Sequence, residues 1–222
     1  MTYRVIQWAS GAIGKTCLRQ VIDHPDLELA GLLVYSEAKA GKDAGEIARR
    51  PPTGIRATRS VDEIVATPAD VVLYTPLNAA DSLAIHDENI LRLLRSGKNV
   101  ITTTAHTYPQ AHGAAYAGRF EEACQQGRAT LFGTGINPGF MVERLSVALT
   151  TICTQVDRMT FTEIYDVSAV RSPGFLFELM GIGRPPGAFQ AETGIQRVFR
   201  HIFTEVVGYV GHALKVEFDD IV

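Results

Sequence analysis

Residues 3–15 hold the feature that most limits the fold of this chain. A short apolar run from Val5 to Ala9 is followed, at Gly11 and Gly14, by a change to helical spacing of the apolar side chains. Such a run is typical of a buried strand, and the pattern after Gly11 is typical of an amphipathic helix. We therefore expect a strand that turns through a glycine-containing loop directly into a helix.

The loop between these two elements has the composition of a phosphate-binding turn. A glycine at position 11 would let the backbone turn sharply and approach a pyrophosphate, and Gly14 would let the helix pack closely on the strand. Free N–H groups at the helix N-terminus favour negative charge. Read as Ala9-x-Gly11-x-x-Gly14, the loop matches the Rossmann dinucleotide-binding fingerprint with alanine in the first position. The cofactor-binding residues predicted here are Ser10, Gly11, Ala12, Ile13 and Gly14.

Composition excludes several classes of partner. The 222 residues are 46% hydrophobic, which suffices for one large core or two small ones, and they carry a net charge of −3. Without a run of Lys or Arg, we expect neither a nucleic-acid nor a membrane-surface partner. The first strand begins almost at the N-terminus and no apolar stretch approaches about 20 residues, so we expect no signal peptide and a cytoplasmic location. The three cysteines are odd in number and far apart, which favours reduced core thiols.

Strands and helices alternate after the first loop. Predicted strands cover 27–34, 69–74, 99–103 and 129–132, and predicted helices cover 82–96 and 113–126, closed by Gly97 and Gly127 as left-handed C-cap residues. This alternation predicts an α/β fold, a doubly wound parallel sheet of the Rossmann type. The loop-rich region 36–60 is either functional or an irregular crossover.

Ligands of such sheets bind beyond the carboxyl ends of the strands. The further cofactor-binding residues predicted at those ends are Ser36, Lys39, Thr75, Pro76, Thr103, Gly135 and Asn137. Ser36 and Lys39 would hold the 2′-phosphate of NADP, whereas an inward-pointing Glu37 would favour NAD. We expect NADP or NAD, with NADP preferred.

The chain resembles the dihydrodipicolinate reductase N-terminal domain superfamily, and within it the proteins similar to 2,4-diaminopentanoate dehydrogenase. The residues that carry the resemblance are 7–14, 24–29, 41–46, 74–76, 96–100 and above all 132–140, with 163–168 and 180–186 extending it. The resemblance implies a dinucleotide-binding domain, residues 1–137, and then a mixed α/β domain, residues 138–222, that supplies a substrate pocket and homo-oligomer contacts. It also implies reversible hydride transfer at a carbon that bears nitrogen, in a diamino acid, an amine or a cyclic imine.

Two departures from the family are visible. The paired-histidine, lysine and Pro-Ser-Gly-Thr signature of the lysine-pathway reductases is absent from the sequence, so that specific activity is not expected. Relatives continue beyond the position of Val222, so the second, α+β domain is expected to be truncated. In it we predict a helix at 142–153, a strand at 158–167, a helix at 173–180, a long helix at 190–214 and the start of a strand at 214–218. The long helix has an apolar stripe from Ile195 to Leu214, which we expect a second copy or the strand at 158–167 to cover.

Three residues are candidate catalytic groups. Asn137 would place an amide near the nicotinamide, unless Asn137-Pro138-Gly139 is only a hinge. Glu163, with Tyr165 and Asp166, would meet a substrate ammonium, unless these side chains are solvated. His106, which like Tyr108 and His112 follows a strand end, would donate a proton, unless it is structural.

Arg171 and Arg184 are candidates for binding a substrate carboxylate. No Cys, His or carboxylate cluster has the spacing of metal ligands, so no metal is expected. The leading interpretation is an NAD(P)-dependent oxidoreductase acting at a C–N centre. The alternative is a catalytically inactive nucleotide-binding protein that serves as a sensor or partner subunit.

Overall fold

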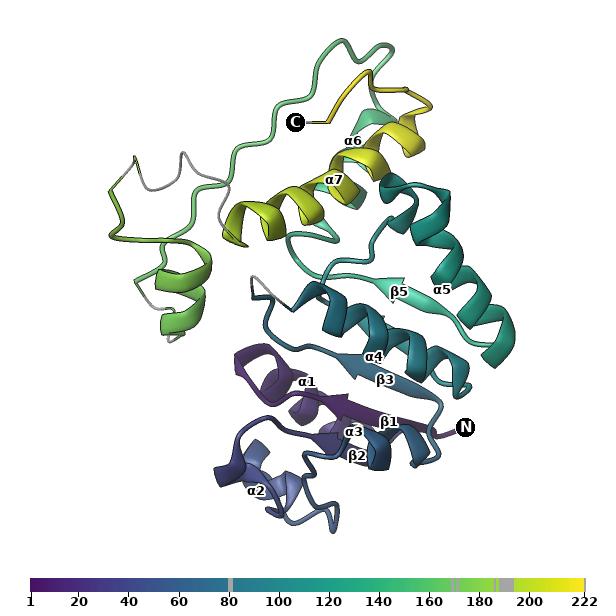
Figure 1. The fold of residues 1–222 in the computed structure, drawn as a ribbon, viewed down its shortest axis with the longest axis vertical. Helices are drawn as coiled ribbons and strands as arrows, with labels where there is room; N and C mark the ends of the chain where they lie inside the picture. The colour runs from purple at the N-terminus through teal and green to yellow at the C-terminus, as the bar shows by residue number, and fades with distance from the viewer. Residues whose placement is uncertain (80–81, 169, 171, 186, 188–193, 222) are drawn as a thin grey trace.

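The computed structural model describes residues 1–79, 82–168, 170, 172–185, 187 and 194–221. Its centre is a parallel sheet of five strands in the order β2-β1-β3-β4-β5 (Figure 1). The strands are β1 (Tyr3–Trp8), β2 (Leu27–Leu33), β3 (Val71–Tyr74), β4 (Asn99–Thr102) and β5 (Leu131–Gly133). This is the Rossmann-type fold that the alternating pattern predicts.

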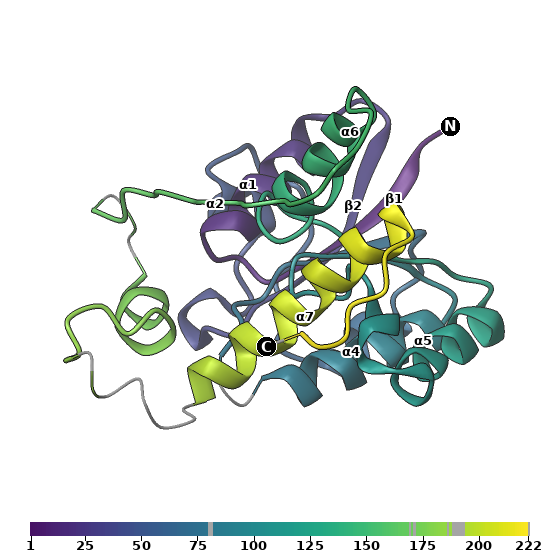
Figure 2. The same ribbon diagram turned by 90° about the horizontal axis from the view of Figure 1, so that it is seen from above.

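Helices cover both faces of the sheet, as Figure 2 shows for α1 and α2 against α4 and α5. One core lies under α1 (Ala12–Asp23) and α2 (Ala44–Ala48), and the other under α3 (Val61–Ala66), α4 (Leu83–Arg95) and α5 (Ala114–Gly127). Successive side chains of β1 enter opposite cores, Val5 the first and Ile6 the second, because side chains alternate across a strand.

One of the two predicted C-caps is confirmed. Gly97 has φ +85, as a left-handed cap requires. The prediction for Gly127 is wrong, because this residue is still helical and Arg128 takes the left-handed conformation with φ 51. Gly127 is needed for space instead, since a Cβ there would lie 1.8 Å from the carbonyl oxygen of Leu94.

The region 36–60 is an ordered crossover organised by one carboxylate. It contains a short 3₁₀ turn, η1 (Glu37–Lys39), and α2. Asp43 accepts hydrogen bonds from the backbone N–H groups of Gly45 at 2.7 Å, Thr53 at 3.0 Å and Gly54 at 2.8 Å. These bonds hold the loop in one conformation beside the C-terminal end of β2.

The second part of the chain has helical segments near the three predicted helices but neither of the two predicted strands. After β5 come a π-helical turn, η3 (Met141–Leu145), then α6 (Ser146–Thr150), a second π-helical turn, η4 (Gly174–Leu179), and α7 (Gly194–Leu214). The predicted strand at 158–167 is wrong, and so is the one at 214–218, because neither segment pairs with a described strand. Figure 1 shows the former as an extended trace that runs away from the sheet.

Part of the apolar stripe of α7 is covered by the chain itself. Val198, Ile202, Val206 and Val210 are buried, and the first three cluster with Ala105, which follows β4. The prediction that a second copy or residues 158–167 cover the stripe is therefore wrong for Ile202 and Val206, whereas Phe203 of the same stripe is 41% exposed. Residues 190–193, where this helix was predicted to begin, lie outside the described residues.

All three cysteines are free thiols, and Cys153 is exposed rather than in the core. Within the described ranges, no helix combines the length and the apolar composition that a membrane span requires.

Candidate functional site

At the junction of β1 and α1, Gly14 packs closely against the backbone of Ala9. A Cβ at Gly14 would lie 2.2 Å from the carbonyl oxygen of Ala9, so only glycine fits there. The sharp turn is at Ala9, with φ 77. The prediction that Gly11 makes this turn is wrong, because its φ of −71 is open to any residue.

The outer side of the same loop is open. A Cβ at Gly11 would meet no described heavy atom within 4 Å, and no described side chain caps the N-terminus of α1 by a hydrogen bond. Ala12 and Ile13 are exposed, while Ser10 is buried. The first N–H groups of a helix have no partner inside the helix, so this end offers donors and positive potential to an anion.

A buried amide, Gln7, supports the loop from below. Its Nε2 donates to the carbonyl oxygen of Ala9 at 2.9 Å and to the Thr75 hydroxyl at 2.8 Å, and that hydroxyl donates to the carbonyl oxygen of Trp8. Thr75, a predicted cofactor contact, thus orients the loop with its hydroxyl. Sequence reasoning missed Gln7, although a glutamine inside an apolar strand is the signal that would have found it.

Lys39, which follows β2, hydrogen-bonds to the β1–α1 loop. Its ammonium donates to the Ser10 carbonyl oxygen at 2.9 Å and to the Ser10 hydroxyl at 3.1 Å. Partial burial, and then the charge of Lys15, lower the pKa of Lys39. Ser36 and Glu37 are exposed beside it. A cation thus lies after the C-terminal end of β2, beside the β1–α1 loop.

The remaining predicted cofactor residues lie at neighbouring strand ends. Pro76 is buried after β3, and Thr103 is partly buried after β4, where its N–H donates to the carbonyl oxygen of Tyr74. Gly135 follows β5 with φ +156. These positions belong to the same carboxyl edge of the sheet as the β1–α1 loop.

The turn at 133–140 is packed so tightly that three positions accept only glycine. Added Cβ atoms would lie 2.3 Å from the backbone of His106 at Gly133, 2.5 Å from Pro138 at Gly135 and 2.4 Å from Gly135 at Gly139. Sequence reasoning missed Glu143 and Arg144, whose side chains hydrogen-bond to the backbone of this turn. Buried Glu143 accepts from the Gly139 N–H at 2.7 Å, and Arg144 donates to the carbonyl oxygens of Gly133 and Gly139.

Two of the three candidate catalytic residues come together. The Asn137 side-chain amide donates to the Glu163 carboxylate, although the two residues lie 26 positions apart. The Asn137 Oδ1 is buried and has no hydrogen-bond partner among the described residues. Asn137 belongs to the tight turn at 133–140, and the Glu163 side chain is exposed.

The third candidate, His106, belongs to a buried polar network with Asp87 and Tyr116. It is 2% exposed, and its Nε2 lies 2.9 Å from Asp87 Oδ1, which also accepts from the Tyr116 hydroxyl. Burial raises the pKa of Asp87, but the bonds from His106 and Tyr116 outweigh it, so the net shift is downward. Such a buried pair favours the structural alternative for His106.

The other candidates from the second part of the chain remain apart. Tyr165 and Arg184 are exposed, and Asp166 accepts from the N–H of Ser168 in its own loop. Arg171 lies outside the described residues. The sequence has no cluster with the spacing of metal ligands, but folding brings His112, His201 and Glu205 together from two distant segments.

Comparisons with known proteins agree with this geometry. A model of the dihydrodipicolinate reductase N-terminus matches residues 5–113. An amine dehydrogenase of Streptomyces virginiae is 28% identical over 224 residues, which cover 97% of this chain and 60% of that protein. The chain therefore spans less than two thirds of the length of this relative.

A solved structure shares the fold. Amine dehydrogenase from Mycobacterium smegmatis superposes with a TM-score of 0.62 at 19% identity, over 71% of this chain and 46% of that one. Together with the glycine-dependent loop, the family match supports the resemblance seen in the sequence: residues 5–113 are similar to the dihydrodipicolinate reductase N-terminus.

Proposed function

We propose that this chain forms the dinucleotide-binding part of an NAD(P)-dependent oxidoreductase that transfers hydride at a C–N centre of an amino acid, an amine or a cyclic imine. The observation that carries the proposal is the β1–α1 loop, where Gly14 packs under the Ala9 carbonyl and the space over Gly11 is open. The family match over residues 5–113 supports the same reading. The names of both amine dehydrogenases support the C–N centre.

The proposed site uses the residues at the carboxyl edge of the sheet. The helix N-terminus at Gly11 to Ile13 holds the pyrophosphate, and Lys39 with Ser36 holds the 2′-phosphate of NADP. The cofactor accepts or supplies the hydride. Asn137 and Glu163 orient the nitrogen-bearing carbon, because an amide and a carboxylate match the hydrogen-bonding groups of an ammonium or iminium. We expect a homo-oligomer and a cytoplasmic location.

The test is a substrate screen followed by absorbance of the reduced cofactor. Purified protein is mixed with NAD⁺ or NADP⁺ and a panel of diamino acids and simple amines, and in reverse with reduced cofactor and cyclic imines. We expect turnover in one C–N class and its loss in Glu163→Gln. Turnover of alcohols in place of amines would contradict the C–N assignment.

A second candidate function is a nucleotide-binding protein without catalysis. It is favoured by the exposure of Glu163 and by the lack of helix or strand in the described residues around it. Calorimetry with NADP⁺ and NAD⁺ distinguishes the two functions, since the second requires cofactor binding with no turnover in the whole panel.

A further inference from the structure

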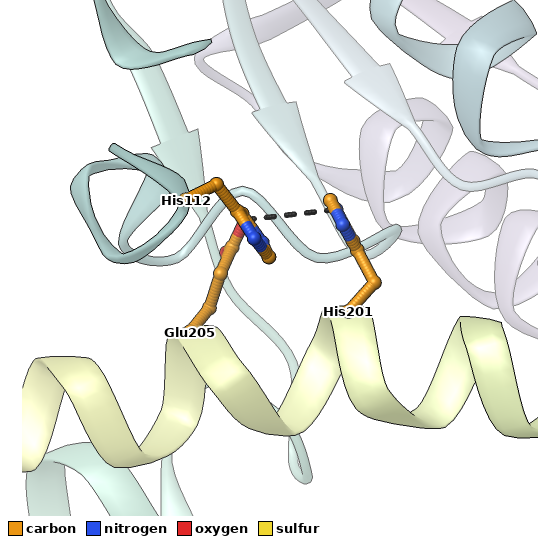
Figure 3. Close-up of side chains that lie close together, drawn as sticks. All are labelled: His112, His201 and Glu205. Carbon is orange, nitrogen blue, oxygen red and sulfur yellow. Dashed lines mark ion pairs between the residues drawn. The ribbon is translucent and has the colours of Figure 1, made fainter. Parts of the chain in front are cut away.

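Three side chains from two distant segments converge beside the Rossmann unit. His112 ends a short 3₁₀ turn, η2 (Pro109–His112), and His201 and Glu205 lie one turn apart on α7. Figure 3 shows both imidazoles and the carboxylate side by side, and one ligand atom of each lies within 4.8 Å of the others. His112 Nε2 is 3.5 Å and His201 Nε2 is 3.9 Å from Glu205 Oε1.

The two oxygens of Glu205 differ in their surroundings. Oε2 accepts from the N–H of Thr107 at 2.6 Å and of Tyr108 at 3.1 Å. Oε1 faces the two imidazoles and has no hydrogen-bond partner among the described residues. The carboxylate, only 1% exposed, is thus anchored by one oxygen and presents the other.

Each imidazole also turns one ring nitrogen toward the same place. Nε2 of His112 and Nε2 of His201 are also buried without a hydrogen-bond partner in the described part of the chain. The rings stack with centroids 4.0 Å apart and planes 6° apart. Three buried polar atoms that face one another without a hydrogen bond destabilise the fold unless something binds all three.

We propose that His112, His201 and Glu205 bind one divalent transition metal ion, with Zn²⁺ as the best match. Two imidazole nitrogens and one carboxylate oxygen are typical zinc ligands, and Mg²⁺ or Ca²⁺ prefer oxygen alone. The ion satisfies all three unpaired atoms, with a water as fourth ligand, after the parallel rings turn about their side-chain torsions until both nitrogens point at it. Because the ligands come from η2 and α7, the ion fastens this helix to the connection after β4. The proposal does not depend on the proposed hydride transfer.

The direct test is calorimetric titration of chelator-treated protein with Zn²⁺. We expect one equivalent to bind, and Glu205→Gln and His201→Gln each to weaken binding by at least about 100-fold, since even loss of an outer-shell partner costs about 10- to 100-fold. Glu205→Gln keeps an oxygen for the Thr107 and Tyr108 N–H groups, so the fold is retained. His212→Gln is the matched control, because His212 is exposed on the same helix. It should bind as the wild type does.

Two further measurements use the unmodified protein. Co²⁺ in the same site should give the intense visible absorption of a four-coordinate ion, and Zn²⁺ should raise the midpoint of thermal unfolding. An absence of Zn²⁺ binding by the wild type, equal binding by both ligand variants, or a weak six-coordinate Co²⁺ spectrum would each overturn the proposal.

Discussion

Gly11 and Gly14 differ in what a side chain would meet at each position. At Gly14 a Cβ would collide with the carbonyl oxygen of Ala9 at 2.2 Å, whereas at Gly11 it would meet no described atom within 4 Å. The first glycine of the pair therefore serves the ligand, and the second serves the packing of α1 on β1. The two roles are separable by mutation.

We predict that Gly11→Val loses cofactor affinity and keeps its stability. The branched side chain occupies the space over the loop, so NAD(P) binding should weaken by at least about 100-fold, or roughly 2.7 kcal/mol. The free energy of unfolding should change by less than about 0.5 kcal/mol, as for other exposed positions. Gly14→Ala is the contrast and should destabilise the fold by about 1–3 kcal/mol through overpacking. Equal cofactor affinity in Gly11→Val and wild type, by calorimetry, would exclude this loop as the site.

A second prediction concerns Lys39 and the choice of cofactor. Lys39→Ala removes a cation that would pair with the 2′-phosphate, and a hydrogen bond to a charged group is worth about 1.5–3 kcal/mol. NADP⁺ affinity should fall by about tenfold or more. NAD⁺ should lose less, through the contact with Ser10 alone. Lys42→Ala, which removes an exposed lysine paired with Glu46, is the control. A matched loss for both cofactors would contradict the assignment.

Among the elements, α4 carries an unusual polar residue on its buried face. His86 is 3% exposed, and its Nδ1 lies 2.9 Å from the hydroxyl of Tyr74 in β3. Burial lowers the pKa of His86 to about 4. The helix therefore packs on the sheet with a neutral imidazole, which links its packing to pH.

We predict that this histidine makes the fold less stable in mild acid. Between pH about 4 and the unfolded value of about 6.5, the unfolded chain binds a proton that the folded chain does not bind. The free energy of unfolding therefore keeps its full value above about pH 6.5. As the pH falls toward 4, His86 lowers it by at most about 3 kcal/mol. Urea unfolding of wild type and His86→Gln at pH 7, 6 and 5 measures this loss of unfolding free energy. The variant should show a smaller loss, whereas a variant of exposed His24 should match the wild type. Parallel curves for wild type and His86→Gln would refute the prediction.

For the molecule as a whole, a large share of the exposed apolar side chains lies on residues 149–165, from the end of α6 onward. The large apolar residues exposed there are Leu149, Ile152, Val156, Met159, Phe161, Ile164 and Tyr165, with Ile164 at 94%. Monomeric proteins seldom expose so many apolar side chains together. Val198, Ile202 and Val206 of the α7 stripe do not add to this surface, because they are buried against the Rossmann unit.

We predict that the 222-residue protein associates through this segment. Light scattering should show a mass that rises with concentration, and an apolar dye should bind. The double variant Phe161→Ser, Ile164→Ser should reduce both signals, whereas Ile85→Ser, which removes an exposed side chain from α4, should not. A stable monomer at high concentration with no dye binding would contradict the prediction.

The sequence by itself determined the elements whose signals are local. The change of period at Gly11, the cap at Gly97 and the apolar strands of the parallel sheet all depend on residues a few positions apart, and the structure confirms them. The glycines at 133, 135 and 139 were recognised as a motif, but only the tertiary contacts show that each lacks room for a Cβ.

Tertiary structure decided everything that depends on contacts between distant segments. It buried His106 against Asp87, covered part of the stripe of α7 with the chain's own β4–α5 connection, and left residues 158–167 without a strand to pair with. It also placed His112 beside His201 and Glu205. A residue's spacing along the chain predicts its neighbours within one helix or strand, whereas burial and pairing follow from which surfaces meet when the whole chain packs.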